Sequence, residues 1–378
     1  MMLNENLSSL QRSGIRRFTN LAKEQPDCVM LTIGEPDFDT PQPIRAAAIT
    51  AMEAGQTHYA PNQGLPALVQ AVADYETNRG YAIAPEQVII TAGATGALYT
   101  ALTGILNPGD EVIVPMPAFP LYESIILAAG AKLVPLHTAK DGFQVSREAL
   151  AEVISPRTKA VILNSPNNPT GVVYTAESLA AVKQAVLGKD IFVICDNVYN
   201  QLCAHAVPDL SLDEDLKEQI LLCQSFSKPY AMTGWRIGYL AGPKAVMERL
   251  LLLHAAEVAS IPTFLQAACV TALQTDISEM AASYERRRGY VCRRLTDMGL
   301  AFPQPTGAFY VFVDISGFGM DSAEFATRLI REAGVATVPG SCFGTEGYIR
   351  LSCCCSEENL QKGLDRLEDF LKSLLAEK

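Results

Sequence analysis

From about residue 87 onward, short apolar runs alternate with longer segments of helical character. The short runs are rich in Val and Ile and predict strands, whereas the longer segments predict helices. Continuous apolar strands separated by helices are typical of a mostly parallel sheet with helices on both faces, so the expected fold class is α/β. The expected strands are 87–91, 111–115, 131–136, 159–164, 191–196, 220–224 and 237–241, and the expected helices are 94–106, 121–129 and 176–186.

The remainder of the chain has a different pattern. After Gly242 we expect a long helical segment that runs towards residue 300. Beyond it, strands at 309–314 and 348–352 and helices at 323–332 and 357–375 predict a smaller α+β unit. A chain of 378 residues is too long for one ordinary core. We therefore expect a large domain over 43–270 and a small domain formed by 1–42 together with 271–378.

Composition and charge exclude several classes of protein. The apolar fraction of 49% and the charged fraction of 19% describe a soluble globular protein. The net charge is −11 and no large basic cluster is present, so we expect no nucleic-acid partner. No apolar stretch approaches the roughly 18 residues of a membrane helix, and the polar N-terminus is unlike a secretory signal. The ten cysteines lack metal-ligand spacing, so we expect no metal and reduced thiols in a cytoplasmic protein.

Polar residues follow the predicted strands, at the edge where open α/β sheets bind ligands. Strand 87–91 leads into the small residues 92–96, including Ala94 and Thr95, at the start of a helix. Such residues allow close backbone approach and free amides attract a phosphate, although a structural turn has the same composition. Strand 159–164 leads into a loop with two prolines and a glycine, which would hold Asn168 rigidly.

Charged residues mark three further strands. Asp196 ends an apolar strand, where a carboxylate is costly without a positive partner, although it could instead cap a helix. Lys228 follows strand 220–224 and the hydroxyl of Ser225, and Arg236 lies eight residues further on. Arg350 lies inside strand 348–352, where it needs an anionic partner.

Together these residues indicate an enzyme that uses pyridoxal 5′-phosphate (PLP). The cofactor has a phosphate, a pyridine nitrogen that must stay protonated, a phenolic oxygen and an aldehyde that condenses with an amine. The sequence offers residues suited to these groups: the small residues 92–96 as a phosphate cradle, and Asn168, Asp196, Tyr199, Lys228, Arg236 and Arg350.

In sequence the chain resembles the class I/II aminotransferases of fold type I, the aspartate and aromatic aminotransferase group. The most specific matches are 168–171 (Asn-Pro-Thr-Gly) and 225–228 (Ser-Phe-Ser-Lys) with 232–236 (Met-Thr-Gly-Trp-Arg). Weaker matches are 33–38, 305–310 and 338–344. The resemblance covers nearly the whole chain. It implies the PLP-dependent transferase fold and transfer of an amino group between an L-amino acid and a 2-oxo acid.

The resemblance also implies the catalytic residues. Lys228 would form the Schiff base with PLP and move the proton at the substrate α-carbon. A free lysine has a pKa of roughly 10.4, so burial and nearby cations must lower it for that task. Asp196 would keep the pyridine nitrogen protonated, and Asn168 and Tyr199 would bond the phenolic oxygen.

The same resemblance assigns the remaining contacts. The phosphate would be held by Ser225, Arg236 and the backbone of Ala94 and Thr95, and Phe119 would stack on the ring, although such an aromatic is otherwise often part of a core. The substrate carboxylate would be bound by the guanidinium fork of Arg350, with Gly34 and Asn168 beside it. Tyr59 would reach the phosphate of a neighbouring subunit, which implies a homodimer.

The chain departs from the family pattern at three positions. Asn197 replaces a Glu, Val69 replaces an Arg, and Pro229 follows the lysine in place of Thr or Ala. None of these positions carries the core chemistry. Asn197 and Val69 are expected to alter the surroundings of the site or the contacts of the dimer.

Two other functions share parts of this pattern. A PLP-dependent C–S β-lyase acting on cystathionine or a cysteine conjugate would use the same fold, lysine and acid. A PLP-sensing transcription factor would carry a basic DNA-binding domain first, but only about 30 residues precede Ile33 and the chain is acidic. Among transamination substrates, aspartate, aromatic, alanine and acyl-diaminopimelate donors remain open. A dicarboxylate would need a second cation, for which Arg16 is a candidate, although a solvated surface position is the alternative.

Overall fold

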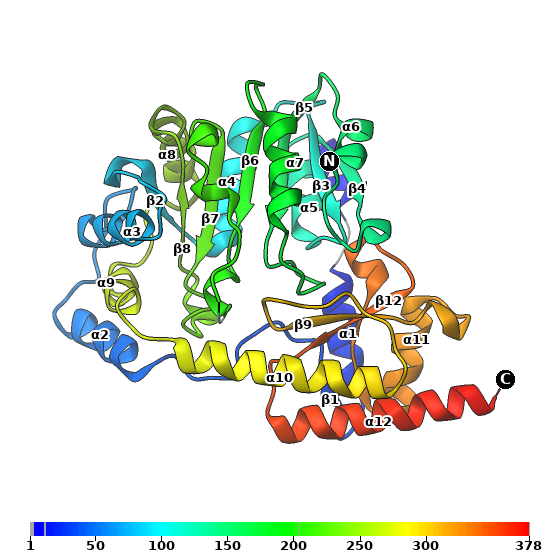
Figure 1. Ribbon diagram of the computed structural model, residues 1–378. Coiled ribbons are helices and arrows are strands. Elements are labelled where there is room, and N and C mark those ends of the chain that lie inside the picture. The colour runs from blue at the N-terminus through cyan, green and yellow to red at the C-terminus, as the bar shows by residue number, and fades with distance from the viewer. Residues whose placement is uncertain (1–3, 11–12, 204, 378) are drawn as a thin grey trace.

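A computed structural model of the protein describes residues 4–10, 13–203 and 205–377. Its largest feature is a seven-stranded sheet built from β2 (Val88–Thr91), β3 (Glu111–Met116), β4 (Lys132–His137), β5 (Thr158–Asn164), β6 (Phe192–Asp196), β7 (Ile220–Ser225) and β8 (Gly238–Ala241). The strand order is β2-β8-β7-β6-β5-β3-β4 (Figure 1). Only β8 runs antiparallel to its neighbours. The predicted α/β class with a mostly parallel sheet is confirmed.

Helices cover both faces of this sheet. Successive side chains of a strand point to opposite faces, so the buried residues divide between two cores. Ile90, for example, packs in one core and its neighbour Ile89 in the other. The first core includes α2 (Gln42–Glu53), α3 (Pro66–Asn78), α6 (Arg147–Val153), α7 (Ala176–Val186) and α9 (Thr263–Ala272). The second includes α4 (Gly93–Ile105), α5 (Leu121–Ala128) and α8 (Lys244–Val258).

A segment near the N-terminus packs with the C-terminal part of the chain beside the large sheet. The short strand β1 (Val29–Met30) pairs in parallel with β10 (Val335–Ala336). A three-stranded antiparallel sheet has the order β11 (Val338–Pro339), β12 (Tyr348–Ser352) and β9 (Tyr310–Asp314). Around these strands lie α1 (Gly14–Lys23), α10 (Ser278–Asp297), α11 (Ser322–Arg328) and α12 (Glu357–Ala376) (Figure 1). A π-helical turn, Leu329–Ala333, extends α11.

The expectation of one long helical segment after Gly242 is wrong. The structure divides this stretch into α8, α9 and α10. Ala259 ends α8 in a positive-φ conformation (φ 56°), and Pro262 precedes α9. Before α10, the Asp276 carboxylate accepts the backbone N–H of Ser278. The other predicted strands and helices are present, with ends that differ by no more than one residue when the π-helical turn is counted with α11.

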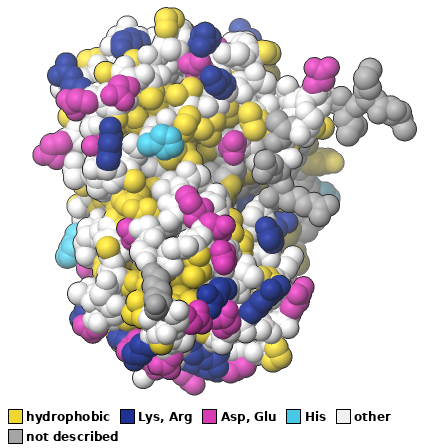
Figure 2. Space-filling model, turned by 90° about the vertical axis from the view of Figure 1, so that its right-hand side faces the viewer, with side chains coloured by type: hydrophobic (Ala, Val, Ile, Leu, Met, Phe, Trp, Pro, Cys, Tyr) yellow, Lys and Arg dark blue, Asp and Glu magenta, His cyan; other side chains and the backbone are white. Residues whose placement is uncertain are grey.

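The surface near α11 and α12 carries charges of both signs. Figure 2 shows Lys and Arg side chains interspersed with Asp and Glu on this face. Ion pairs formed by residues of α11, α12 and the adjoining segments include Arg328 with Glu332, Arg366 with Asp27 and Arg294 with Glu368. Within the described ranges, no helix combines the length and apolar character needed to cross a membrane.

Candidate active site

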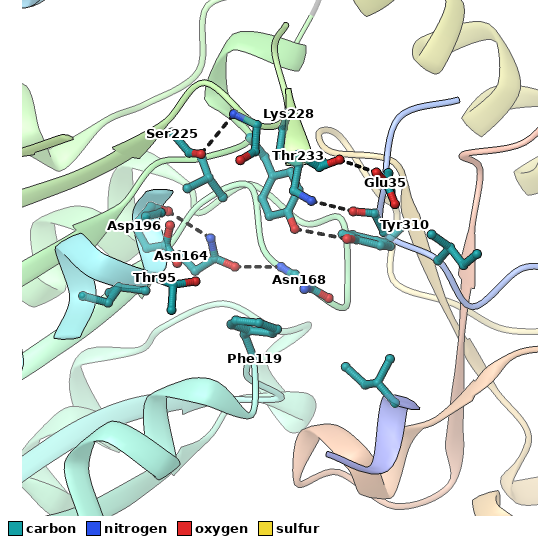
Figure 3. A pocket seen from close by; sticks show the side chains of 18 of the residues that line it. Glu35, Thr95, Phe119, Asn164, Asn168, Asp196, Ser225, Lys228, Thr233 and Tyr310 are labelled. Carbon is teal, nitrogen blue, oxygen red and sulfur yellow. Dashed lines mark hydrogen bonds between the residues drawn. The ribbon is translucent and has the colours of Figure 1, made fainter. Parts of the chain in front are cut away.

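A cavity of about 520 Å³ lies where β5, β6 and β7 end, between the large sheet and the residues that precede α2. Figure 3 shows its labelled side chains around a central space, with Lys228 and Ser225 on one side and Phe119 on the other. Eleven of the twelve site residues expected from the sequence line this cavity. They are Gly34, Ala94, Thr95, Phe119, Asn168, Asp196, Tyr199, Ser225, Lys228, Arg236 and Arg350.

One end of the cavity is suited to an anion. Ala94 and Thr95 belong to the first turn of α4, which has no side-chain cap, so its first N–H groups are available to a ligand. The guanidinium of Arg236 lies against Gly93, where an added Cβ would be 2.8 Å from Nη2. Gly93 also has a φ of +70°, so this close approach requires glycine. Ser225 adds a buried hydroxyl, which accepts the Ser227 N–H at 3.0 Å.

A buried carboxylate lies at the end of β6. Asp196 is 4% exposed, and its Oδ2 accepts a hydrogen bond from the hydroxyl of Tyr122. The other oxygen, Oδ1, is buried and makes no hydrogen bond of regular geometry with the described residues. Burial raises the pKa of Asp196 to about 6, although the Tyr122 hydroxyl, the Val198 backbone and the charge of Lys228 oppose the shift. Oδ1 is therefore suited to a cationic partner.

Lys228 lies between the sheet and the segment that follows β1. Its Nζ donates to the carbonyl oxygen of Gly34 at 2.5 Å. Burial lowers the pKa of Lys228 to about 8, and the charges of Arg350 and Arg236 lower it further, while Cys354 and Glu35 oppose the shift. A substantial fraction of the amine is therefore neutral near physiological pH, as a nucleophile or a base requires.

Arg350 is a buried cation in the lining of the cavity. It is 2% exposed, and its Nη1 and Nη2 donate to Asn168 Oδ1 at 2.8 Å and to the Thr32 carbonyl at 2.6 Å. The rings of Tyr310 and Phe343 lie 4.4 and 4.9 Å from its guanidinium carbon. Its Nε is buried without a hydrogen-bond partner among the described residues. A buried guanidinium in neutral surroundings is suited to bind a carboxylate.

Three residues of the site were not assigned a role from the sequence. Tyr122 bonds Asp196, and the Tyr310 hydroxyl lies 3.1 Å from that of Tyr199. Asn164 donates from Nδ2 to the Asp196 carbonyl at 2.9 Å and accepts the Asn168 N–H at 2.8 Å (Figure 3). Asn164 is the last residue of a predicted strand, so the position itself was a usable signal. Tyr122 and Tyr310 lie in apolar surroundings that give no such signal.

Four other positions lie away from the cavity. Tyr59 is 91% exposed and lines a separate depression with residues 57–58 and 260–264. Arg16 is exposed and does not line the cavity, although its neighbour Ile15 does. Asn197 donates to both carboxylate oxygens of Asp209, at 3.0 and 2.9 Å. Val69 belongs to α3 and is buried in the first core.

Comparison with known proteins identifies relatives of the whole chain. The family model for aminotransferase class I and II matches residues 26–367. A probable N-acetyl-LL-diaminopimelate aminotransferase of Bacillus subtilis is 41% identical over 377 residues, which cover 98% of this chain and 96% of the relative. An aspartate/prephenate aminotransferase of Thermus thermophilus is 40% identical over 359 residues, which cover 93% of both chains.

Solved structures agree with these matches. The aspartate aminotransferase from Thermus thermophilus with maleate superimposes with a TM-score of 0.93 at 38% identity, over 98% of this chain and 99% of that one. An aromatic aminotransferase from Pyrococcus horikoshii gives a TM-score of 0.88 at 37% identity, over 94% of this chain and 99% of that one.

Proposed function

The chain belongs to the class I and II aminotransferases, a PLP-dependent family of transaminases, and we propose that its cavity holds PLP between Lys228 and Asp196. When bound, PLP supplies an aldehyde for the amino group and a ring that accepts electrons. The observation that carries the assignment is the buried Oδ1 of Asp196, which lacks a hydrogen bond of regular geometry and fits a protonated ring nitrogen. Lys228, a largely buried amine of lowered pKa, is the residue to which PLP attaches.

The other contacts follow from the same placement. The first turn of α4, at Ala94 and Thr95, holds the phosphate together with Ser225 and Arg236. The side chains of Asn168 and Tyr199 would hydrogen-bond the phenolic oxygen, and Phe119 would stack on the ring. Each of these groups lines the cavity, and their chemistry matches the parts of the cofactor one by one.

The substrate amino acid is bound by its carboxylate. Arg350 presents its guanidinium fork, and Asn168, which accepts from Arg350, and Gly34 line the same cavity. An added Cβ on Gly34 would collide with the Tyr310 hydroxyl, so glycine leaves room for that tyrosine beside Arg350. With the carboxylate fixed, the neutral Nζ of Lys228 removes the proton from the substrate α-carbon.

A half-reaction tests this function. Mixing the PLP-loaded enzyme with amino donors in single turnover is expected to convert the absorbance of lysine-bound cofactor to that of its aminated form. A 2-oxo acid should then restore the first spectrum. The aminotransferase relatives lend no support to the β-lyase alternative. Release of pyruvate and sulfide from cysteine or cystathionine, without the reversible spectral change, would contradict amino transfer.

Replacing Arg350 by Lys is expected to lower kcat/KM for amino donors by roughly 10- to 100-fold. The variant keeps the positive charge but loses the two-pronged fork, and a hydrogen bond to a charged group contributes about 1.5–3 kcal/mol. The fall in kcat/KM should come mainly from a higher KM, because the carboxylate is bound in the ground state as well as in the transition state. Steady-state kinetics measure it, with Arg366→Lys, whose arginine is paired with Asp27 far from the cavity, as the control. An unchanged KM in Arg350→Lys would contradict the assignment.

Three further features belong to the proposal. The enzyme is a cytoplasmic homodimer, in which the exposed Tyr59 of one subunit approaches the phosphate site of the other. The pairing of β1 with β10 supports a small domain of 1–42 and 271–378 beside a large domain of 43–270. A particle of twice the chain mass in light scattering is expected, together with a weaker affinity for PLP in Tyr59→Phe.

The relatives are named for aspartate, prephenate and N-acetyl-LL-diaminopimelate, so their names leave the amino donor open.

A further inference from the structure

The wall of the cavity beside Arg350 is largely apolar. Ile15 from α1 and Ile33 from the segment after β1 both line it, and the hydroxyl of Thr19, also in the lining, donates to the Ile15 carbonyl at 3.0 Å. Ile33 is 38% exposed, which is unusual for an isoleucine within a cavity wall. Because Gly34 is its neighbour in the chain, Ile33 lies next to the place proposed for the substrate carboxylate. The side chain of a bound amino acid therefore meets this wall.

We propose that the enzyme selects amino donors with uncharged, apolar side chains and disfavours the dicarboxylic donors aspartate and glutamate. This inference rests on the proposed function, because it uses Arg350 as the site of the α-carboxylate. The acceptor 2-oxo acid enters the same cavity, so its own side chain meets the same wall.

The cations of the cavity are all committed to other tasks. Among the described residues, the lining contains only three of them, Lys228, Arg236 and Arg350. Arg350 holds the α-carboxylate, Lys228 lies at the reacting carbon, and Arg236 is directed to the phosphate site against Gly93. A second carboxylate on the substrate would find no cation of its own in this lining.

Nearby arginines outside the lining are also occupied or directed elsewhere. Arg16 and Arg17 follow Ile15 in the sequence, but both are exposed, and the guanidinium of Arg17 lies 5.5 Å from the ring of Phe18. Arg287 forms an ion pair with Asp37 at 2.7 Å and packs over the ring of Phe38. Neither α1 nor α10 therefore supplies a cation to the substrate side chain from the described residues.

The cavity also contains an acid that would oppose a second carboxylate. Glu35 lies in the lining and is exposed, and one of its oxygens accepts a hydrogen bond from Thr233. Its negative charge opposes the lowering of the Lys228 pKa, so Glu35 lies close enough to influence charges within the site. A dicarboxylate would meet repulsion from Glu35 in addition to the apolar wall.

The proposed dimer would bring a second surface towards the cavity. The depression around Tyr59, the surface that would approach the second subunit's cavity, is lined by Thr57, His58, Ser260, Ile261, Pro262, Thr263 and Phe264. No lysine or arginine occurs in that lining. A carboxylate placed against an isoleucine wall loses hydration without gaining a partner, which costs about 1–3 kcal/mol, or roughly 5- to 150-fold in kcat/KM.

A panel of donors tests the inference on the PLP-loaded enzyme. In single-turnover measurements, kcat/KM for leucine, methionine and phenylalanine is expected to exceed that for aspartate and glutamate by roughly 5- to 150-fold. Equal or faster conversion with aspartate or glutamate would overturn the inference and leave the proposed function intact. Absence of conversion with every donor would overturn the proposed function itself.

A charge introduced into the wall provides the matched test. Ile33→Lys is expected to shift the ratio of kcat/KM for aspartate over leucine upward by at least about tenfold, because the new cation pairs with the distal carboxylate. Ile33→Gln, which is polar but neutral, should change the ratio far less, and Arg16→Gln, outside the cavity, should leave it unchanged. Ile15→Lys repeats the test if the first variant does not fold. No shift in either folded lysine variant would overturn the placement of the substrate side chain.

Discussion

Lys228→Ala is expected to abolish amino transfer, with a fall in kcat of at least about 1,000-fold. Proton transfer by a positioned side chain contributes about 100- to 10,000-fold, and the variant also loses the covalent anchor of the cofactor. PLP should still bind, more weakly, because Ser225, Arg236 and the start of α4 are unchanged. Steady-state rates with a responsive donor, and absorbance of the dialysed protein, measure the two effects.

The pH dependence of the wild-type enzyme supplies a second readout for Lys228. Only the neutral amine condenses with an aldehyde, so the rate at which PLP attaches to the cofactor-free enzyme should rise with pH while the lysine loses its proton, and level off above its pKa of about 8. Lys244→Ala is the control, because that lysine is exposed and paired only with Glu86. Wild-type turnover in Lys228→Ala would refute the assignment of this lysine.

The strand ends explain how much of the site could be predicted. The carboxyl ends of parallel strands meet at one edge of a sheet, so Asp196 after β6 and Lys228 after β7 had to lie close together once the strands were recognised. The local sequence also predicts the phosphate site, because α4 begins directly after β2. These features depend on neighbours in the sequence and on a general rule of sheet topology.

The remainder depends on packing between distant segments. The bond from Tyr122 to Asp196 joins residues 74 positions apart, and the cation–π contact of Arg350 with Tyr310 depends on the register of β12 against β9. Neither tyrosine differs in sequence from an ordinary core aromatic. The break after α8 had one sequence signal, Pro262, but the positive φ lies at Ala259, where a glycine would have marked the end of the helix more clearly.

Asp196→Asn is expected to lower kcat by about 100- to 1,000-fold while the protein stays folded and still binds PLP. A preorganised charge aimed at a developing charge typically contributes this much, and the neutral amide cannot hold a proton on the ring nitrogen. The size and the Tyr122 hydrogen bond of the side chain are nearly conserved. Asp209→Asn, at a carboxylate bonded to Asn197 outside the cavity lining, is the control. Activity within about tenfold of wild type in Asp196→Asn would contradict its role.

The pH dependence of stability distinguishes this role from a purely structural one. Burial raises the pKa of Asp196 from 3.8 to about 6 in the cofactor-free protein, so its contribution to stability is complete below about 3.8 and is lost as the pH rises through about 6. A cationic partner at Oδ1 removes that loss, because it favours the carboxylate. The gain in Tm on PLP binding should therefore grow between pH 5 and about 7.5 in the wild type. In Asp196→Asn the growth should be smaller, because only the loss of the Lys228 proton, which is common to both proteins, then favours attachment of PLP. Equal growth in both proteins would contradict the role of Asp196.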